Sequence, residues 1–75
     1  MSKKSLMEDM KRAPQRFYRA PSDVIRDRRF SDAERLEILS AWEAIAGENT
    51  TEYQQAAEAR DEIERKRASE TEEPL

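Results

Sequence analysis

The side chains whose spacing best suits catalysis or metal binding are three acids in the second half of the chain, Glu58, Asp61 and Glu62. At spacing i, i+3, i+4 on a helix they could hold a hard divalent ion or form an acid pair. Asp61, however, precedes Arg65 by four residues, and Glu62 precedes Lys66 by the same distance, which is the order that favours ion pairs on a helix. We therefore interpret the three acids as a solvated, ion-paired helix face.

Other catalytic groups are scarce in the sequence. The chain has no His and no Cys, which removes the commonest general base, the commonest transition-metal ligand and all thiolate or disulfide chemistry. It has one Gly, which excludes a Gly-rich phosphate-binding loop. We expect a protein that is not an enzyme and that binds no cofactor and no metal.

The sequence supports anion binding better than catalysis, through the basic segment 11–29. Its Lys and Arg side chains are interleaved with Phe17 and Tyr18, a pattern typical of segments that follow phosphates and stack on bases. The candidate contacts to an anionic partner are four arginines: Arg12, Arg16, Arg19 and Arg26. The helix expected at 32–46 argues against a helix-turn-helix, because it carries four acidic residues against Arg35 alone. Nucleic-acid binding through the phosphate backbone is therefore the alternative hypothesis.

Charge is divided unevenly along the 75 residues, of which 41% are charged. Residues 1–30 carry nine basic and four acidic side chains, a balance of +5, whereas residues 31–75 carry five basic and thirteen acidic ones, a balance of −8. This asymmetry indicates either an anionic partner for the first half or attraction between the two halves, within or between chains. A chain this short also buries little surface alone, so we expect a homo-oligomer or a protein partner.

The elements that would position these residues are helices. Near the amino end, Ser5 and Glu8 can form a capping box, but Pro14 ends any helix there after about two turns. A helix so short is unstable without packing. We expect residues 1–16 to form a basic flexible arm.

The rest of the chain is expected to divide into a small helical domain, residues 17–68, and an acidic disordered tail, residues 69–75. After Pro21, Ser22 can cap a short helix over about 23–28. Two longer helices that pack antiparallel follow it. The expected fold class is all-α, a short helix followed by an antiparallel helical hairpin, with disordered termini.

The first helix of the hairpin, residues 32–46, has the clearest boundary signals. Ser31 and Glu34 can form a capping box, and Gly47 supplies a left-handed stop. Its apolar side chains cover about half of the helix surface, which is too wide a stripe for one helical neighbour. The second helix is expected to begin after a Thr51 cap and to end near residue 67, with a thin apolar face.

Two destinations are open for the large apolar side chains. Burial in the core is the ordinary one, and it is expected for eight apolar side chains between residues 17 and 42: Phe17, Tyr18, Val24, Ile25, Phe30, Leu36, Leu39 and Trp42. The stripe on the 32–46 helix also predicts a homodimer through that helix, because Trp is enriched among interface hot spots. The candidate interaction residues are Ile38, Trp42, Ile45 and Tyr53.

The stretch YRAPSDVIRDRRFSDAERLEILSAWE, residues 18–43, resembles a group of short uncharacterised bacterial proteins. Their pattern is Tyr-Arg-x-Pro-Ser-Asp-Val, then Asp-x-Arg-Leu-Ser, then an acidic, Leu-containing helix that ends in Trp-Glu. The matching positions cover about a third of the chain: Tyr18, Arg19, Pro21, Ser22, Asp23, Val24, Asp27, Arg29, Ser31, Leu36, Ile38, Leu39, Trp42 and Glu43. Phe30 stands where the group has Leu, and Ile45 where it has an acid. The resemblance implies a shared structural unit and no particular activity.

The functional expectation is a small helical module for protein–protein interaction or regulation that associates with itself through the 32–46 helix. The alternative is a nucleic-acid-associated regulatory protein that binds through segment 11–29. No apolar run is long enough for a signal peptide or a membrane span. We therefore expect a cytoplasmic protein with no membrane partner.

Overall fold

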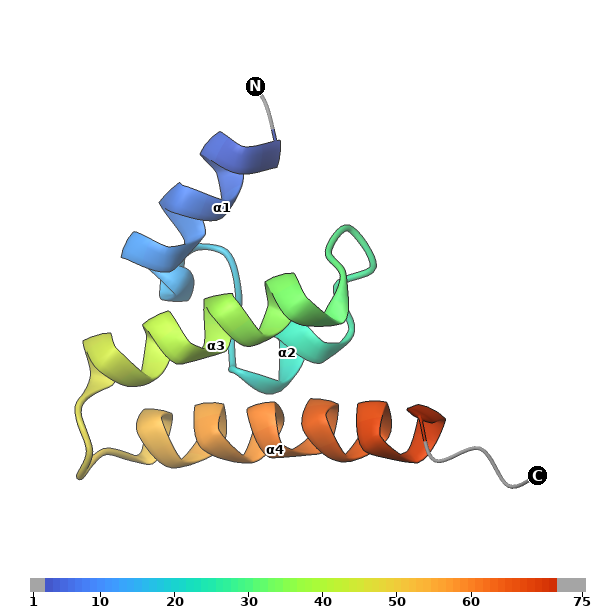
Figure 1. Ribbon diagram of the computed structural model, residues 1–75. Helices are drawn as coiled ribbons and strands as arrows, with labels where there is room; N and C mark the ends of the chain where they lie inside the picture. The colour runs from blue at the N-terminus through green and yellow to red at the C-terminus, as the bar shows by residue number, and fades with distance from the viewer. Residues whose placement is uncertain (1–2, 72–75) are drawn as a thin grey trace.

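The computed structural model describes residues 3–71, which form four α-helices and one short 3-10 helix (Figure 1). No strand occurs in this part of the chain. The elements are α1 (Lys3–Arg12), η1 (Pro14–Arg16), α2 (Ser22–Ile25), α3 (Asp32–Ala46) and α4 (Thr51–Thr71). The predicted all-α fold, a short helix followed by an antiparallel hairpin, is confirmed by α2, α3 and α4.

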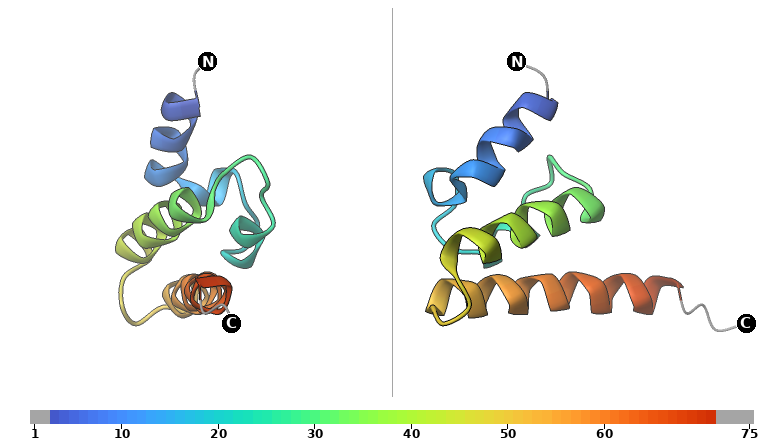
Figure 2. Two further views of the ribbon diagram at one scale, coloured as in Figure 1. Left: turned by 45° about the vertical axis from the view of Figure 1, so that its right-hand side comes forward. Right: turned by 60° about the vertical axis from the view of Figure 1, so that its left-hand side comes forward.

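Helix α3 lies in the middle of the molecule. Figure 2 shows α1 on one side of α3 and α4 on the other, with α2 beside the hairpin, and α3 contacts all three of these helices. Most of the wide apolar stripe of α3 is therefore covered within the chain by these three neighbours, whereas Ile45 stays exposed. None of the helices within residues 3–71 combines the length and the apolar character that a bilayer crossing needs.

Both boundaries of α3 follow the sequence signals. The Ser31 hydroxyl accepts from the Glu34 backbone N–H at 3.3 Å, and a Glu34 carboxylate oxygen accepts from the Ser31 N–H at 2.7 Å, so the predicted capping box is present. At the other end Gly47 has φ of 87° and donates its N–H to the Glu43 carbonyl at 3.0 Å. The predicted glycine stop is confirmed, since a residue with a side chain rarely adopts this φ.

Helix α4 is capped one residue earlier than predicted. The Thr50 hydroxyl, not that of Thr51, accepts from the Tyr53 N–H at 3.1 Å and donates to the Gly47 carbonyl at 2.9 Å. The same side chain thus joins the end of α3 to the start of α4. The helix also continues to Thr71, so the start of the segment predicted as a tail, 69–75, is helical, and residues 72–75 lie outside the described part.

Residues 1–16 were expected to form a flexible arm, but the described part of this segment, residues 3–16, forms α1 and η1. Helix α1 buries Met7 and Met10, and Pro14 behind it is also buried. A ten-residue helix gains little from its own hydrogen bonds, so packing against α3 supplies its stability. Lys11 also lies 3.6 Å from Glu37 of α3 in an exposed ion pair.

Helix α2 does not begin with the predicted Ser22 cap. Pro21 occupies the N-cap position and no side chain caps it, so Ser22 is not the cap. The Asp23 carboxylate instead accepts from the Ala20 N–H at 3.3 Å. Helix α2 is a single turn, but this turn is enough to place Val24 in the core, with Ile25 packed at the edge of the core.

The core is one cluster between the helices. Its buried apolar members come from every helix except η1 and from the two linkers that flank α2: Met7, Met10, Tyr18, Val24, Phe30, Ile38, Leu39, Trp42, Ala56, Ala59 and Ile63. The small Ala56 and Ala59 let α4 approach α3 closely. Arg60 of α4 reinforces this contact by donating to Ser40 at 3.2 Å and to Glu43 at 3.1 Å.

Candidate functional site

The four candidate interaction residues do not share one surface. Ile38 is fully buried and Trp42 is only 1% exposed, so both lie in the core of the chain itself. Tyr53 is half-buried, and Ile45 alone is well exposed, at 44%. At Ile38 and Trp42 the stripe on α3 is thus covered by the chain's own helices, so the prediction that these two residues contact a partner is wrong.

Trp42 has the surroundings of a structural residue. Its indole N–H donates to a Glu52 carboxylate oxygen at 3.1 Å, across the hairpin. Its ring lies 6.3 Å, centroid to centroid, from the ring of Tyr18. Because the ring is packed and its one donor is satisfied, Trp42 offers nothing further to a ligand.

Tyr18 leads into a polar network in the loop between α2 and α3. Its hydroxyl donates to Asp27 Oδ2 at 2.7 Å and lies 3.5 Å from the sulfur of Met10. Arg29 binds the same carboxylate in a bidentate manner, with Nε 3.0 Å from Oδ1 and Nη2 2.7 Å from Oδ2. The hydrogen bonds from Arg29 hold the pKa of Asp27 well below its usual range. Burial, and then the bond to Asp27, raises the pKa of Tyr18.

Arg35 of α3 completes what we call the Asp27 network, which comprises Tyr18, Asp27, Arg29 and Arg35. Its guanidinium donates twice to the Asp27 carbonyl, at 3.0 and 2.9 Å, and once to the Asp32 carboxylate, at 2.7 Å. The Asp27 carboxylate, which accepts from Tyr18 and Arg29, is a poor base. The Tyr18 phenol, whose pKa is raised, is a poor nucleophile. The network therefore fixes the loop between α2 and α3.

A different arrangement occurs where α1 meets η1. A hollow of about 490 Å³ lies there, and we call it the α1–η1 corner. Its lining consists of five residues: Asp9, Arg12, Ala13, Arg16 and Phe17. Two of the four candidate anion-binding arginines, Arg12 and Arg16, thus line one hollow, because η1 begins at Pro14, directly after α1, and contacts it.

Phe17 is exposed at this corner, contrary to its predicted place in the core. The backbone N–H groups of Phe17 and Tyr18 both donate to the Pro14 carbonyl at 3.0 Å, so the two residues leave the same tight turn. Tyr18 enters the core, whereas Phe17 remains 43% exposed beside the two arginines. No sequence signal distinguishes the adjacent rings, since both are aromatic and both follow the same proline.

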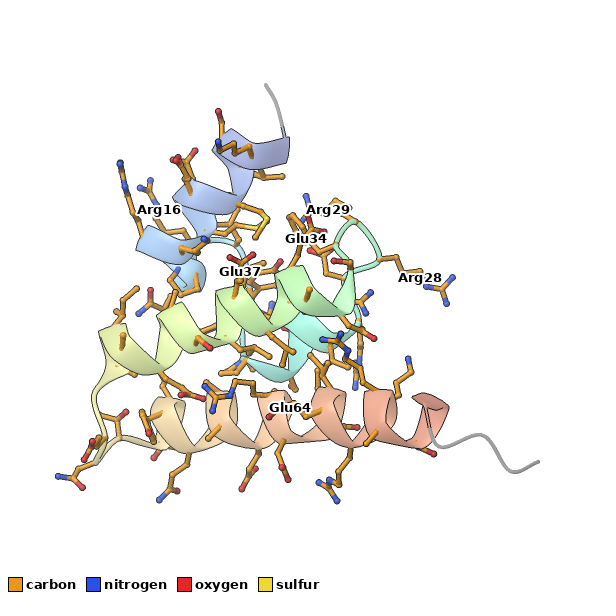
Figure 3. The ribbon with its side chains drawn as sticks, viewed as in Figure 1. Arg16, Arg28, Arg29, Glu34, Glu37 and Glu64 are labelled. Carbon is orange, nitrogen blue, oxygen red and sulfur yellow. The ribbon has the colours of Figure 1, made fainter. Side chains whose placement is uncertain are left out.

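The arginines at the corner lack partners. Within residues 3–71, the side chains of five arginines form no hydrogen bond and no ion pair: Arg12, Arg16, Arg19, Arg26 and Arg28. All five are exposed, but Arg19, Arg26 and Arg28 do not line the corner. Figure 3 shows Arg16 at the end of α1 and Arg28 on the opposite side of the molecule. The predicted set of four anionic contacts is therefore split in space.

The three acids near the end of the chain do not form a metal site. Asp61 pairs with Arg65 at 3.3 Å, as predicted from their spacing. Glu58 and Glu62 instead line a groove between α2 and α4, which sequence patterns did not indicate. No group of three His, Cys, Asp or Glu within residues 3–71 is placed to hold a metal ion.

The α1–η1 corner is the strongest candidate site, because it is the described hollow in which unpaired cations and an exposed aromatic ring coincide. Its two arginines and the exposed ring of Phe17 suit recognition of an anionic, partly apolar surface. Comparisons with protein families, with curated proteins and with solved structures find no match for this chain.

Proposed function

We propose that the chain is a non-enzymatic interaction module that binds an acidic protein surface through the α1–η1 corner. The observation that carries the proposal is the position of Arg12 and Arg16, both unpaired, around the exposed ring of Phe17. Arg and aromatic residues are enriched at protein interfaces, where a guanidinium can bind a carboxylate bidentately. An exposed Phe beside two such cations favours a partner that is both acidic and apolar.

Several charges favour a protein over a nucleic acid as the partner. Asp9 lines the same hollow, and Glu37 of α3 lies next to the end of α1 through its pair with Lys11. A continuous phosphate backbone would meet both carboxylates, whereas a folded protein can present its acids only where the arginines lie. The net charge of −3 also opposes approach to a polyanion.

The proposal can be tested by fluorescence anisotropy with a labelled copolymer of Glu and Tyr, which imitates an acidic, aromatic protein surface. We expect the protein to bind the copolymer. The variant Arg12→Glu/Arg16→Glu should have an affinity at least about tenfold lower, because two attractions become repulsions. Phe17→Ser should also weaken binding without changing the charge.

The matched control is Lys4→Glu/Arg28→Glu, which changes the net charge equally at exposed positions outside the corner. Its binding should remain close to that of the unaltered protein. Equal weakening by the two double variants would mean that only net charge matters, and the assignment of the corner would be withdrawn. Absence of copolymer binding would overturn the proposal outright.

Nucleic-acid binding through segment 11–29 remains the second candidate function. The observation in its favour is that Arg19, Arg26 and Arg28 are also exposed and unpaired, so free cations extend well beyond the corner. The same anisotropy series with a random-sequence oligonucleotide tests it. Strong, salt-sensitive binding to the oligonucleotide, with none to the copolymer, would place this function first.

A further inference from the structure

The groove between α2 and α4 is the second hollow of note, with a volume of about 230 Å³. We call it the α2–α4 groove, and its lining comes from both helices and from the linker that precedes α2: Ala20, Ser22, Ile25, Gln55, Glu58, Ala59 and Glu62. It exists because α2 is a single helical turn, which covers only part of the long α4. Figure 1 shows α4 extending past α2.

The groove combines an apolar floor with acidic edges. Ile25 is only partly buried, and Ala59 beside it is small, so a space for an apolar side chain is left over them. Glu58 and Glu62 stand four residues apart on α4 and are both exposed. Neither forms an ion pair or hydrogen bond with a described residue, although Lys66 lies one turn beyond Glu62.

These features are the complement of the α1–η1 corner. The corner has two unpaired cations and a projecting aromatic ring, while the groove has two unpaired anions and an apolar floor. The division of charge along the chain, +5 before residue 31 and −8 after it, has the same sense. Within one chain the two surfaces cannot meet, because α1 and α4 lie on different sides of α3 (Figure 2).

We propose that the α2–α4 groove of one copy receives the α1–η1 corner of a second copy, with Phe17 over Ile25 and Arg12 and Arg16 facing Glu58 and Glu62. This inference rests on the proposed function, since it names the acidic partner of the corner. The contact is heterologous, so each pair leaves one corner and one groove open and further copies can add head to tail. It also differs from the two-fold dimer that the stripe on α3 predicted.

Charge reversal provides a direct test, with solution mass measured by light scattering over a concentration series. We expect the mass of the unaltered protein to rise above that of a single chain, 8.8 kDa, and less so at higher salt. The corner-reversed variant, Arg12→Glu/Arg16→Glu, and the groove-reversed variant, Glu58→Arg/Glu62→Arg, should each remain single chains, because like charges then face each other.

Combining the variants should restore association. An equimolar mixture of the corner-reversed and groove-reversed proteins offers opposite charges at every contact, so its mass should rise again. The fourfold variant that carries both reversals keeps the net charge of −3 and should associate alone, which excludes a mere effect of net charge. Circular dichroism of each variant checks that the helices are intact.

The outcomes separate this inference from the proposed function. If the protein stays a single chain at all concentrations but still binds the Glu–Tyr copolymer through the corner, the second copy is wrong and the corner keeps its role. If the protein associates but both reversals leave its mass unchanged, the contact lies elsewhere, with exposed Ile45 the next surface to test. If neither copolymer binding nor association occurs, both proposals fall.

Discussion

Arginine side chains in two regions of this molecule have opposite surroundings. In the Asp27 network, Arg29 and Arg35 donate to carboxylate and carbonyl oxygens at 2.7–3.0 Å. At the α1–η1 corner, Arg12 and Arg16 have no acceptor within the described chain. The difference teaches that a basic sequence is not by itself a binding surface: arginines with internal acceptors hold the fold, and those without them are available to a partner.

The largest effect should come from removing the ring that supports the network. Trp42→Ala deletes a buried side chain against which Tyr18 packs, and such truncations cost about 3–5 kcal/mol, which is most of the stability of a domain this small. We expect the variant to be largely unfolded by circular dichroism and urea titration.

Phe17→Ala is the control for that variant at the corner. Its ring is 43% exposed, so the free energy of unfolding should change by only about 0.5 kcal/mol. Similar losses of stability in both variants would contradict the division between a structural and an available region.

A smaller effect is expected from Asp27→Asn, which removes the charge that Arg29 binds. The lowered pKa of Asp27 means that its ionised form stabilises the fold above about pH 4 and that this contribution is lost as the pH falls below that value. The variant should therefore be less stable at pH 7, by about 1.5–3 kcal/mol for charged hydrogen bonds, partly offset by exposure of Arg29.

Urea titrations from pH 7 down to pH 2 would measure this dependence. The difference between the two proteins should narrow as the pH falls below about 4, because Asp27 of the unfolded chain is protonated there and the unfolded state of the unaltered protein is thereby stabilised. A constant difference over that range would show that the carboxylate charge is not what stabilises the loop.

Within the Asp27 network, a smaller effect than that of Asp27→Asn is expected from Tyr18→Phe, which removes one hydroxyl and keeps the ring. Loss of the bond to Asp27 should cost about 1 kcal/mol at neutral pH. Since the pKa of Tyr18 is raised in the folded chain, its neutral form stabilises the fold below about pH 10 and this contribution disappears as the pH rises further. Denaturation at pH 7 and pH 11 should show the advantage of Tyr18 shrinking; an advantage that grew would refute this account of the hydrogen bond.

The sequence was a good guide to three signals that act over one helical turn. The Ser31–Glu34 capping box, the Gly47 stop and the Asp61–Arg65 pair each depend on residues at most four positions apart, and the structure has all three. The cap of α4 was placed one residue late because Thr50 and Thr51 are adjacent and both are able to cap.

The residues of the candidate site and of the groove were harder to predict, because their positions depend on which helices contact each other. The width of the α3 stripe correctly indicated more than one neighbour, but α1 was not predicted to be one of them. A helix that is unstable alone cannot be recognised from its own residues when its stability comes from packing. The α2–α4 groove was missed for the same reason, since its two walls are at least thirty residues apart in the chain.

The sequence by itself determined that the chain is helical, where α3 begins and ends, and that it has no His or Cys for chemistry, because these follow from composition and from contacts within a helical turn. Only the tertiary structure decided that Trp42 is core, that Phe17 faces out while Tyr18 faces in, and which arginines have acceptors. Burial and pairing are properties of surfaces that meet across the whole fold, so they exist only once the helices are packed.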